Sequence, residues 1–193
     1  MSLDQLAKEV FEILGEEQIP AEIIGGYALA HYGYVRNTTD IDVVVKEHQR
    51  ALDVLKSRGF VEGEKWFKLV NPKDSSLGVD VLPAGRRMSG NVINNPSPTQ
   101  VSGQPVFTSL YNLVESKVGV MASNNSERIV KAKSEADVGY MIQKNNLPLD
   151  YLDSSSDENV VFVYRELWEA MEKDKKDITK KGEWVDPFEE FLK

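Results

Sequence analysis

The chain has 193 residues and a formal net charge of −8, with 31 acidic and 23 basic side chains. This length suits one domain, or a compact domain with an appendage, and it is sufficient for a substantial hydrophobic core. The absence of cysteine excludes disulfides, thiol nucleophiles and thiolate zinc sites, and two histidines leave little for a zinc or haem site. The acidic balance argues against a broad nucleic-acid-binding surface.

A hydrophobic content of 41 % with regular polar punctuation is typical of a globular protein. No segment resembles a transmembrane span, and the opening residues lack the basic and then apolar character of a secretion signal. We therefore expect a cytoplasmic protein without a membrane partner.

Apolar residues recur with helical and strand periods along the first part of the chain. Ser2 and Gln5 form a capping-box pattern before the first helical stretch, and Gly33 and Gly59 follow two others. The predicted elements are a helix over 3–16, a strand over 21–24, a helix over 27–32, a strand that carries Asp40 and Asp42, a helix over 47–58, and strands over 66–70 and 77–82. The last two strands are joined by a hairpin-type turn over 71–76.

A long loop is predicted over 83–107, because this stretch is rich in Gly, Pro, Ser and Asn, with room for one short strand. A loop of this length inside a compact domain is usually functional or mobile. Its Arg86 and Arg87 could meet phosphate, although a solvated surface pair is the more ordinary interpretation.

The second half of the chain reads as helical. Helices are predicted from Thr108 or Ser109 to residue 122, from a cap at Ser126 to residue 144, and over 160–173. The acidic, serine-rich stretch 153–158 is a linker or a helix start. We expect the charged tail after residue 173 to lie on the surface, anchored by Trp184 and Phe188.

Three aspartates lie in predicted strands, where this residue type is depleted. Asp40 and Asp42 are two residues apart, so their side chains share one strand face while the apolar neighbours share the other. Asp80 lies between two valines and takes the same alternation. If the two strands are neighbours, three carboxylates gather, and their mutual repulsion favours a divalent cation such as Mg²⁺. The alternative is a solvated face of an antiparallel sheet.

Gly25 and Gly26 stand between a predicted strand and a predicted helix. Such a turn exposes backbone N–H groups without side-chain obstruction at the positive end of the helix dipole, where phosphate binds well. A tight turn that needs a positive φ angle explains the same pair without any ligand.

Together these residues resemble the minimal nucleotidyltransferase fold of the polymerase-beta-like superfamily. The resemblance covers residues 22–82 and rests on the diglycine, on the segment from Arg36 through Thr38 to Asp42, and on the Val-Asp-Val around Asp80. Within the superfamily the chain is most similar to small abortive-infection toxin-like and aminoglycoside nucleotidyltransferases. Many members have Gly-Ser in place of Gly-Gly, and Gly-Gly is common in the toxin-like branch.

The resemblance implies an α/β fold with a small mixed, twisted sheet flanked by helices, followed by a helical carboxy-terminal half. We expect a catalytic core over 1–107, with the Asp40 strand central, and a helical region over 108–193 packed on it. The helical half is similar to the family at three positions only: Lys117, where a phosphate-contacting lysine is often found, and Arg128 with Asp137.

The implied activity is transfer of a nucleoside monophosphate from a nucleoside triphosphate such as ATP to an acceptor hydroxyl, with release of pyrophosphate. Asp40, Asp42 and Asp80 would be the catalytic residues and would bind two Mg²⁺ ions, or Mn²⁺. The nucleotide would contact Gly25, Gly26, Arg36, Thr38 and Lys117, although Thr38 could equally stabilise the turn before its strand.

Two other functions fit the same residues. The fold could bind nucleotide or a partner protein without turnover, or the carboxylates could hydrolyse a phosphoester and release inorganic phosphate. For a transferase, the acceptor could be RNA, a protein or a cationic small molecule. A toxin-like role would imply an antitoxin protein as partner.

Overall fold

The computed structural model describes residues 1–34, 37–65, 67–85, 96–123 and 126–181, the last six of them by their backbone only. The elements are α1 (Leu3–Glu16), β1 (Ala21–Ile24), α2 (Gly25–His31), β2 (Asp40–Val45), α3 (His48–Ser57), β3 (Val61–Glu62), β4 (Lys68–Asn71), β5 (Asp74–Pro83), α4 (Leu110–Ala122), α5 (Arg128–Asn145) and α6 (Glu158–Lys181). None of the helices within these ranges has the length and apolar character needed to cross a membrane.

The five strands form one mixed sheet in the order β1-β2-β5-β4-β3. β2 is antiparallel to β1 and parallel to β5, whereas β5 is antiparallel to β4. The expectation that the Asp40 strand is central is therefore wrong in detail: β2 is an interior strand, and β5 occupies the middle. β5 is in the middle because two strands lie on each side of it, β2 and β1 on one side and β4 and β3 on the other.

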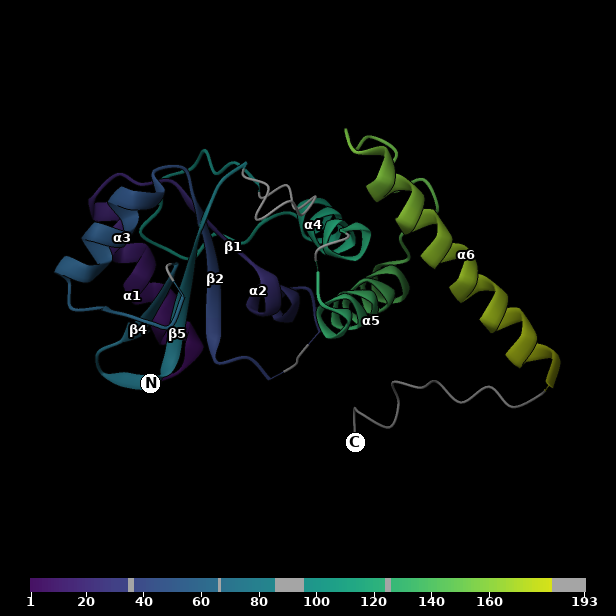
Figure 1. Ribbon diagram of the computed structural model, residues 1–193, viewed down its shortest axis with the longest axis horizontal. Helices are drawn as coiled ribbons and strands as arrows, with labels where there is room; N and C mark the ends of the chain where they lie inside the picture. Colours follow the sequence, from purple (N-terminus) through teal and green to yellow (C-terminus); the bar gives the residue numbers. More distant parts are fainter. Residues whose placement is uncertain (35–36, 66, 86–95, 124–125, 182–193) are drawn as a thin grey trace.

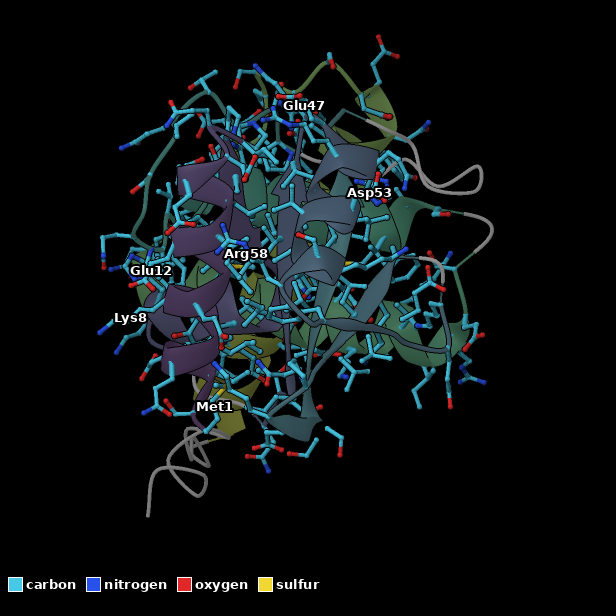
Figure 2. The ribbon with its side chains drawn as sticks, turned by 90° about the vertical axis from the view of Figure 1, so that its left-hand side faces the viewer. Met1, Lys8, Glu12, Glu47, Asp53 and Arg58 are labelled. Carbon is cyan, nitrogen blue, oxygen red and sulfur yellow. The ribbon has the colours of Figure 1, made fainter. Side chains whose placement is uncertain are left out.

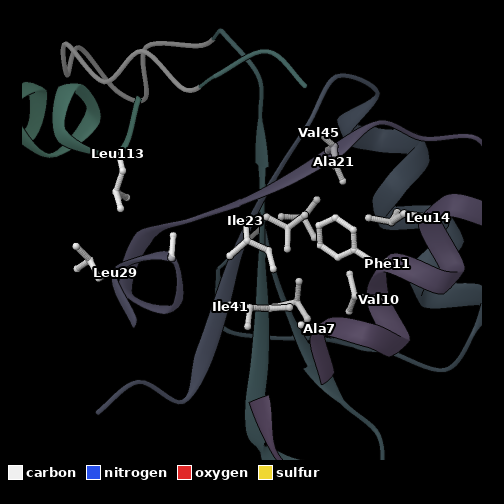
Figure 3. Packing of buried hydrophobic residues seen from close by; sticks show 14 of the residues in the cluster. Ala7, Val10, Phe11, Leu14, Ala21, Ile23, Leu29, Ile41, Val45 and Leu113 are labelled. Carbon is white, nitrogen blue, oxygen red and sulfur yellow. The ribbon is translucent and has the colours of Figure 1, made fainter. Parts of the chain in front are cut away.

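Helices lie on both sides of this sheet (Figure 1), which confirms an α/β fold with a flanked sheet. α1 and α3 cover one side, and their outward faces carry charged side chains that include Lys8, Glu12 and Asp53, with Arg58 directly after the end of α3 (Figure 2). The inward face of α1 packs Val10, Phe11 and Leu14 against the sheet (Figure 3). The predicted capping box is confirmed, because Ser2 Oγ accepts from the Gln5 N–H and the Ser2 N–H donates to Gln5 Oε1.

The opposite side of the sheet is covered by α2 and by the start of the helical half. Leu29 of α2 and Leu113 of α4 lie together there in the same buried cluster (Figure 3). Residues 106–108 run along the free edge of β1: the Ile23 N–H donates to Val106 O at 2.7 Å, and the Thr108 N–H donates to Ile23 O at 2.9 Å. The short strand expected inside the long loop is thus found at its end, as a parallel bridge between Ile23 and Phe107.

Several predicted boundaries need correction. The hairpin turn is shorter than expected, because Asn71 Oδ1 accepts from the Lys73 N–H and β5 already begins at Asp74. Strand β3 was not predicted, since its two residues are both exposed and show no alternation. Trp66, at the start of the predicted strand 66–70, lies outside the described residues.

The helical half also differs at two helix ends. Ser126 does not cap α5, whose N-cap is Glu127 with no side-chain bond, whereas the predicted cap at Ser109 is confirmed for α4. α6 begins earlier and ends later than residues 160–173, because Asp157 Oδ1 accepts from the Asn159 N–H at its start and charged helix-forming residues continue past the apolar stripe. Arg86, Arg87, Trp184 and Phe188 lie outside the described residues.

Candidate active site

The three aspartates predicted from the sequence meet on one face of the sheet. In the parallel ladder of β2 with β5, Asp42 lies opposite Asp80, and Asp40 lies opposite Gly78. The alternating residues Ile41, Val43, Val79 and Val81 are fully buried against the other face. The alternation of the two strands therefore projects the three carboxylates together, and the pairing of β2 with β5 is the arrangement that the sequence left open.

The diglycine packs directly on Asp42. Gly25 has φ +67°, and a Cβ atom placed on it would overlap Asp42 Oδ2. The Gly26 backbone N–H donates to the Asp42 carboxylate. The interpretation of the diglycine as a positive-φ turn is thus confirmed at Gly25, and the absent side chain also makes room for the carboxylate. Contact of either glycine with phosphate stays a prediction.

The electrostatics of the site reflect carboxylates held together out of water. Burial is the largest cause that raises the pKa of Asp42, and the charges of Asp80 and Asp40 raise it further, to about 6 in total. Burial also raises the pKa of Asp80, against the opposing charge of Lys68. Asp80 Oδ1 is buried and has no hydrogen-bond partner among the residues that the structure describes. The site therefore holds a buried carboxylate oxygen that no hydrogen bond from the described residues satisfies.

Lys68 is a site residue that sequence reasoning missed. It lies on β4 opposite Asp80, and its Nζ is 3.1 Å from Asp40 Oδ2. Burial lowers the pKa of Lys68, but the hydrogen bond to Asp40 and the charges of all three aspartates outweigh it, so the pKa is raised. A prediction of which residues pair across the β4–β5 hairpin would have placed Lys68 beside Asp80.

The loop before β2 contributes Thr38. Its hydroxyl donates to Asp40, lying 3.0 Å from Oδ1 and 3.1 Å from the backbone oxygen. Thr38 therefore orients Asp40 at the start of β2. This contact agrees with a role in stabilising the turn before the strand, whereas contact with nucleotide stays a prediction. Arg36 lies outside the described residues, so its phosphate-binding role stays a prediction.

Lys117 reaches the site from α4. Its charge lowers the pKa of Asp42, and its Nζ lies 2.8 Å from Oδ2 of the buried Asp137 on α5. The helical half thus places one cation near the carboxylates, and Asp137 holds it there. Arg128 is exposed at the first residue of α5.

The carboxylates suit a hard divalent cation by their chemistry. Oxygen donors on neighbouring strands are the ligands that Mg²⁺ and Mn²⁺ prefer, and the unpartnered Asp80 Oδ1 is a donor of this kind among the described residues. Over the same ranges, however, no group of three or more acidic, His or Cys side chains is already arranged to hold a metal ion. The three aspartates therefore offer the donor atoms that Mg²⁺ or Mn²⁺ prefers, but within the described residues they are not arranged as a complete set of metal ligands.

Known structures share this fold. The chain is similar to the antibiotic-resistance factor ANT(2'')-Ia in its crystal structure with adenylyl-2''-tobramycin, with a TM-score of 0.54 and 14 % sequence identity over 87 % of this chain and 99 % of that chain. It is also similar to an antigenic nucleotidyltransferase-like protein from Paracoccidioides brasiliensis, with a TM-score of 0.51 and 16 % identity over 92 % of this chain and 90 % of that chain. No family model matches the sequence, and no curated protein matches it.

These likenesses identify the fold. The chain has the nucleotidyltransferase fold, with a mixed five-stranded sheet and six helices within the described residues. The resemblance read from the diglycine and the three aspartates is thereby confirmed at the level of fold.

Proposed function

We propose that the chain is a nucleotidyltransferase that transfers a nucleoside monophosphate from a nucleoside triphosphate to an acceptor hydroxyl. The observation that carries the proposal is the alignment of Asp40, Asp42 and Asp80 on one sheet face, with Gly25 packed on Asp42. Burial and the charges of Asp80 and Asp40 raise the pKa of Asp42, and carboxylates perturbed in this way are typical of functional sites.

In this reaction the acceptor oxygen bonds to the α-phosphorus, the bond from that phosphorus to the β-phosphate oxygen breaks, and pyrophosphate leaves. Asp40 and Asp42 would bind Mg²⁺ or Mn²⁺, with Asp80 as a further ligand. When bound, such ions neutralise phosphate charge and polarise the reacting phosphoryl group. Asp80 would take the proton of the acceptor hydroxyl, because its buried Oδ1 has no other partner among the described residues.

The remaining predicted residues would hold the nucleotide. Gly25 and Gly26 would let the triphosphate approach the backbone, and Arg36 would neutralise phosphate charge. Lys117 would add positive charge beside Asp42, where its field already acts. Thr38 would support the site by orienting Asp40.

The acceptor is proposed only by class. A cationic small molecule is supported by the acidic chain and by the likeness to ANT(2'')-Ia, whose crystal structure contains adenylyl-2''-tobramycin. RNA and protein hydroxyls stay open, as do a toxin role and an antitoxin partner.

The proposal is tested by thermal unfolding with each ribonucleoside triphosphate, with and without Mg²⁺. A ligand at a hundred times its dissociation constant adds about 2.7 kcal/mol to the folded state. We expect stabilisation that needs both the nucleotide and Mg²⁺ and is lost in Asp42→Asn. Asp53→Asn is the matched control, because Asp53 is exposed on the outward face of α3 and should leave the shift unchanged.

Stabilisation that is independent of Mg²⁺ and survives in Asp42→Asn would contradict the proposal. That outcome would favour a binding module that recognises nucleotide without turnover.

A further inference from the structure

Lys68 reaches its partner by an unusual path across the sheet. It belongs to β4, whereas Asp40 belongs to β2, and β5 lies between these two strands. The residue of β5 opposite Asp40 is Gly78. A Cβ atom at position 78 would lie 3.1 Å from Lys68 Cε, so glycine leaves the space through which the lysine crosses to Asp40.

Both oxygens of Asp40 are engaged in this arrangement. The Thr38 hydroxyl donates to Oδ1 at 3.0 Å, and the Lys68 ammonium lies 3.1 Å from Oδ2. A metal ion bound at Oδ2 would place a second cation on the oxygen that already faces the ammonium, and like charges at such a distance repel. The Lys68 ammonium therefore disfavours a divalent cation at this oxygen.

We propose that Lys68 is a resident counter-ion, which occupies Asp40 until a divalent cation displaces it. The inference rests on the proposed function, because that function brings the metal to Asp40. Lys68 and Asp40 each keep 31 % of their side-chain surface exposed, and ion pairs with this much solvent access are weak enough to exchange. Nucleotide phosphates, which arrive with the metal, offer the released ammonium a new partner.

This arrangement couples metal binding to nucleotide binding. A metal ion alone must displace Lys68 into water, whereas a metal ion with nucleotide displaces it towards phosphate. The bare protein should consequently bind metal weakly, and loss of the ammonium should strengthen that binding.

The test is titration of the nucleotide-free protein with Mn²⁺ alone, with free Mn²⁺ measured by electron paramagnetic resonance. Lys68→Met should bind Mn²⁺ about fivefold more tightly than the wild type, the factor set by an exposed ion pair. Lys65→Met is the matched control, because Lys65 is exposed and its charge also acts on Asp80 without a contact to Asp40. Lys65→Met should change the Mn²⁺ affinity less than twofold if the Lys68 ammonium competes directly with the metal ion. A loss of nearby positive charge alone would affect both variants.

A second measurement guards against a variant that merely unfolds. Without metal, Lys68→Met should have a lower thermal midpoint than the wild type, since Asp40 loses its counter-ion. Added Mn²⁺ should then raise that midpoint more in Lys68→Met than in the wild type, and Lys68→Arg should restore the wild-type behaviour in both measurements.

Equal or weaker Mn²⁺ affinity in folded Lys68→Met would overturn the inference while leaving the proposed function intact, provided that the wild type binds Mn²⁺ and Asp42→Asn does not. An equal gain in Lys65→Met would also overturn it, because the effect would then be one of general charge. Absence of Mn²⁺ binding in every variant would overturn the inference, whereas the metal-dependent function is tested separately by the stabilisation that needs both nucleotide and Mg²⁺.

Discussion

Gly25 leaves room for the Asp42 carboxylate, because a Cβ atom at position 25 would overlap Asp42 Oδ2. Gly25→Ala should destabilise the fold for two reasons, the positive φ angle and the overlap of the new methyl group with Asp42 Oδ2. Gly85 separates these causes, because it has φ +63° and nothing within 4 Å of the position of a Cβ. We expect Gly85→Ala to cost about 1–2 kcal/mol in urea unfolding. Gly25→Ala should cost about 1–3 kcal/mol more, and equal losses would contradict the packing of Gly25 on Asp42.

Asp42 predicts a pH dependence of stability. Its pKa is raised from 3.8 to about 6, so the folded chain binds more protons than the unfolded chain between these values. The favourable contribution of this group is therefore present below pH 4 and is lost as the pH rises through 6. Asp42→Asn removes the repulsion, and without metal it should exceed the wild type in free energy of unfolding by up to ~3 kcal/mol at pH 8.

The difference should shrink as the pH falls from 6 to 4, because the wild-type carboxyl then becomes neutral as well. Urea unfolding at a series of pH values measures it. A variant that is less stable than the wild type at pH 8 would show that the ionised Asp42 has a structural role.

The sequence predicted the three aspartates of the site, but it did not point to Lys68, which pairs with Asp40. Asp40, Asp42 and Asp80 stand out because aspartate is rare in strands and alternation fixes the face of each. Lys68 is inconspicuous in its own strand, and its role appears only when β4, β5 and β2 are placed in register with Gly78 between them. Pairing across three strands is set by tertiary packing rather than by local pattern.

A side-chain cap stabilises the start of α4, whereas α5 has no such cap among the described residues. The Ser109 hydroxyl accepts from the Asn112 N–H at 3.2 Å at the start of α4, the helix that carries Lys117. Ser109→Ala should cost about 1 kcal/mol of stability. Ser126→Ala should stay within about 0.5 kcal/mol of the wild type, because Ser126 does not cap α5. Thermal unfolding of the two variants compares them, and equal losses would contradict the assignment of the caps.

Element types were easier to predict than element ends. The capping box of α1 and the cap of α4 are local patterns, and both were read correctly. The end of α6 could not be read from its apolar stripe, since the helix continues through charged residues beyond it to Lys181. β3 exists only because β4 offers it an edge to pair with.

Side-chain contacts join residues 1–107 to the helical region over 108–193. Tyr32 Oη donates to Thr108 O at 2.7 Å, Tyr140 Oη donates to Gly33 O at 2.8 Å, and the rings of Tyr34 and Tyr140 stack with centroids 4.4 Å apart. Together with the shared core around Leu29 and Leu113, these contacts favour one cooperative unit. The division into a core over 1–107 and a helical region over 108–193 stays a prediction about sequence regions.

Native-state hydrogen exchange tests this cooperativity. Slowly exchanging amides in β2 and in α5 should open with the same free energy, equal to that of global unfolding. A clearly lower opening free energy in α5 would mean that the helical region unfolds by itself and that 1–107 behaves as a separate core.

At the scale of the molecule, the sequence predicted the fold because the diglycine and the aspartates carry local signals. The order of the strands was less accessible, since β5 takes the middle place through long-range pairing with both β2 and β4. The acceptor is the least accessible feature, because it depends on surface shape that residue spacing does not encode.

Transfer itself is measured most directly with a nucleoside triphosphate labelled at the α-phosphate, incubated with Mg²⁺ and separate pools of RNA, protein and aminoglycoside. We predict that the α-label moves to one pool, that pyrophosphate appears in equal amount, and that Asp42→Asn produces neither. Release of inorganic phosphate without labelling would indicate a hydrolase instead. Unchanged nucleotide in every pool, with wild-type protein shown to be folded, would contradict nucleotidyl transfer at this site.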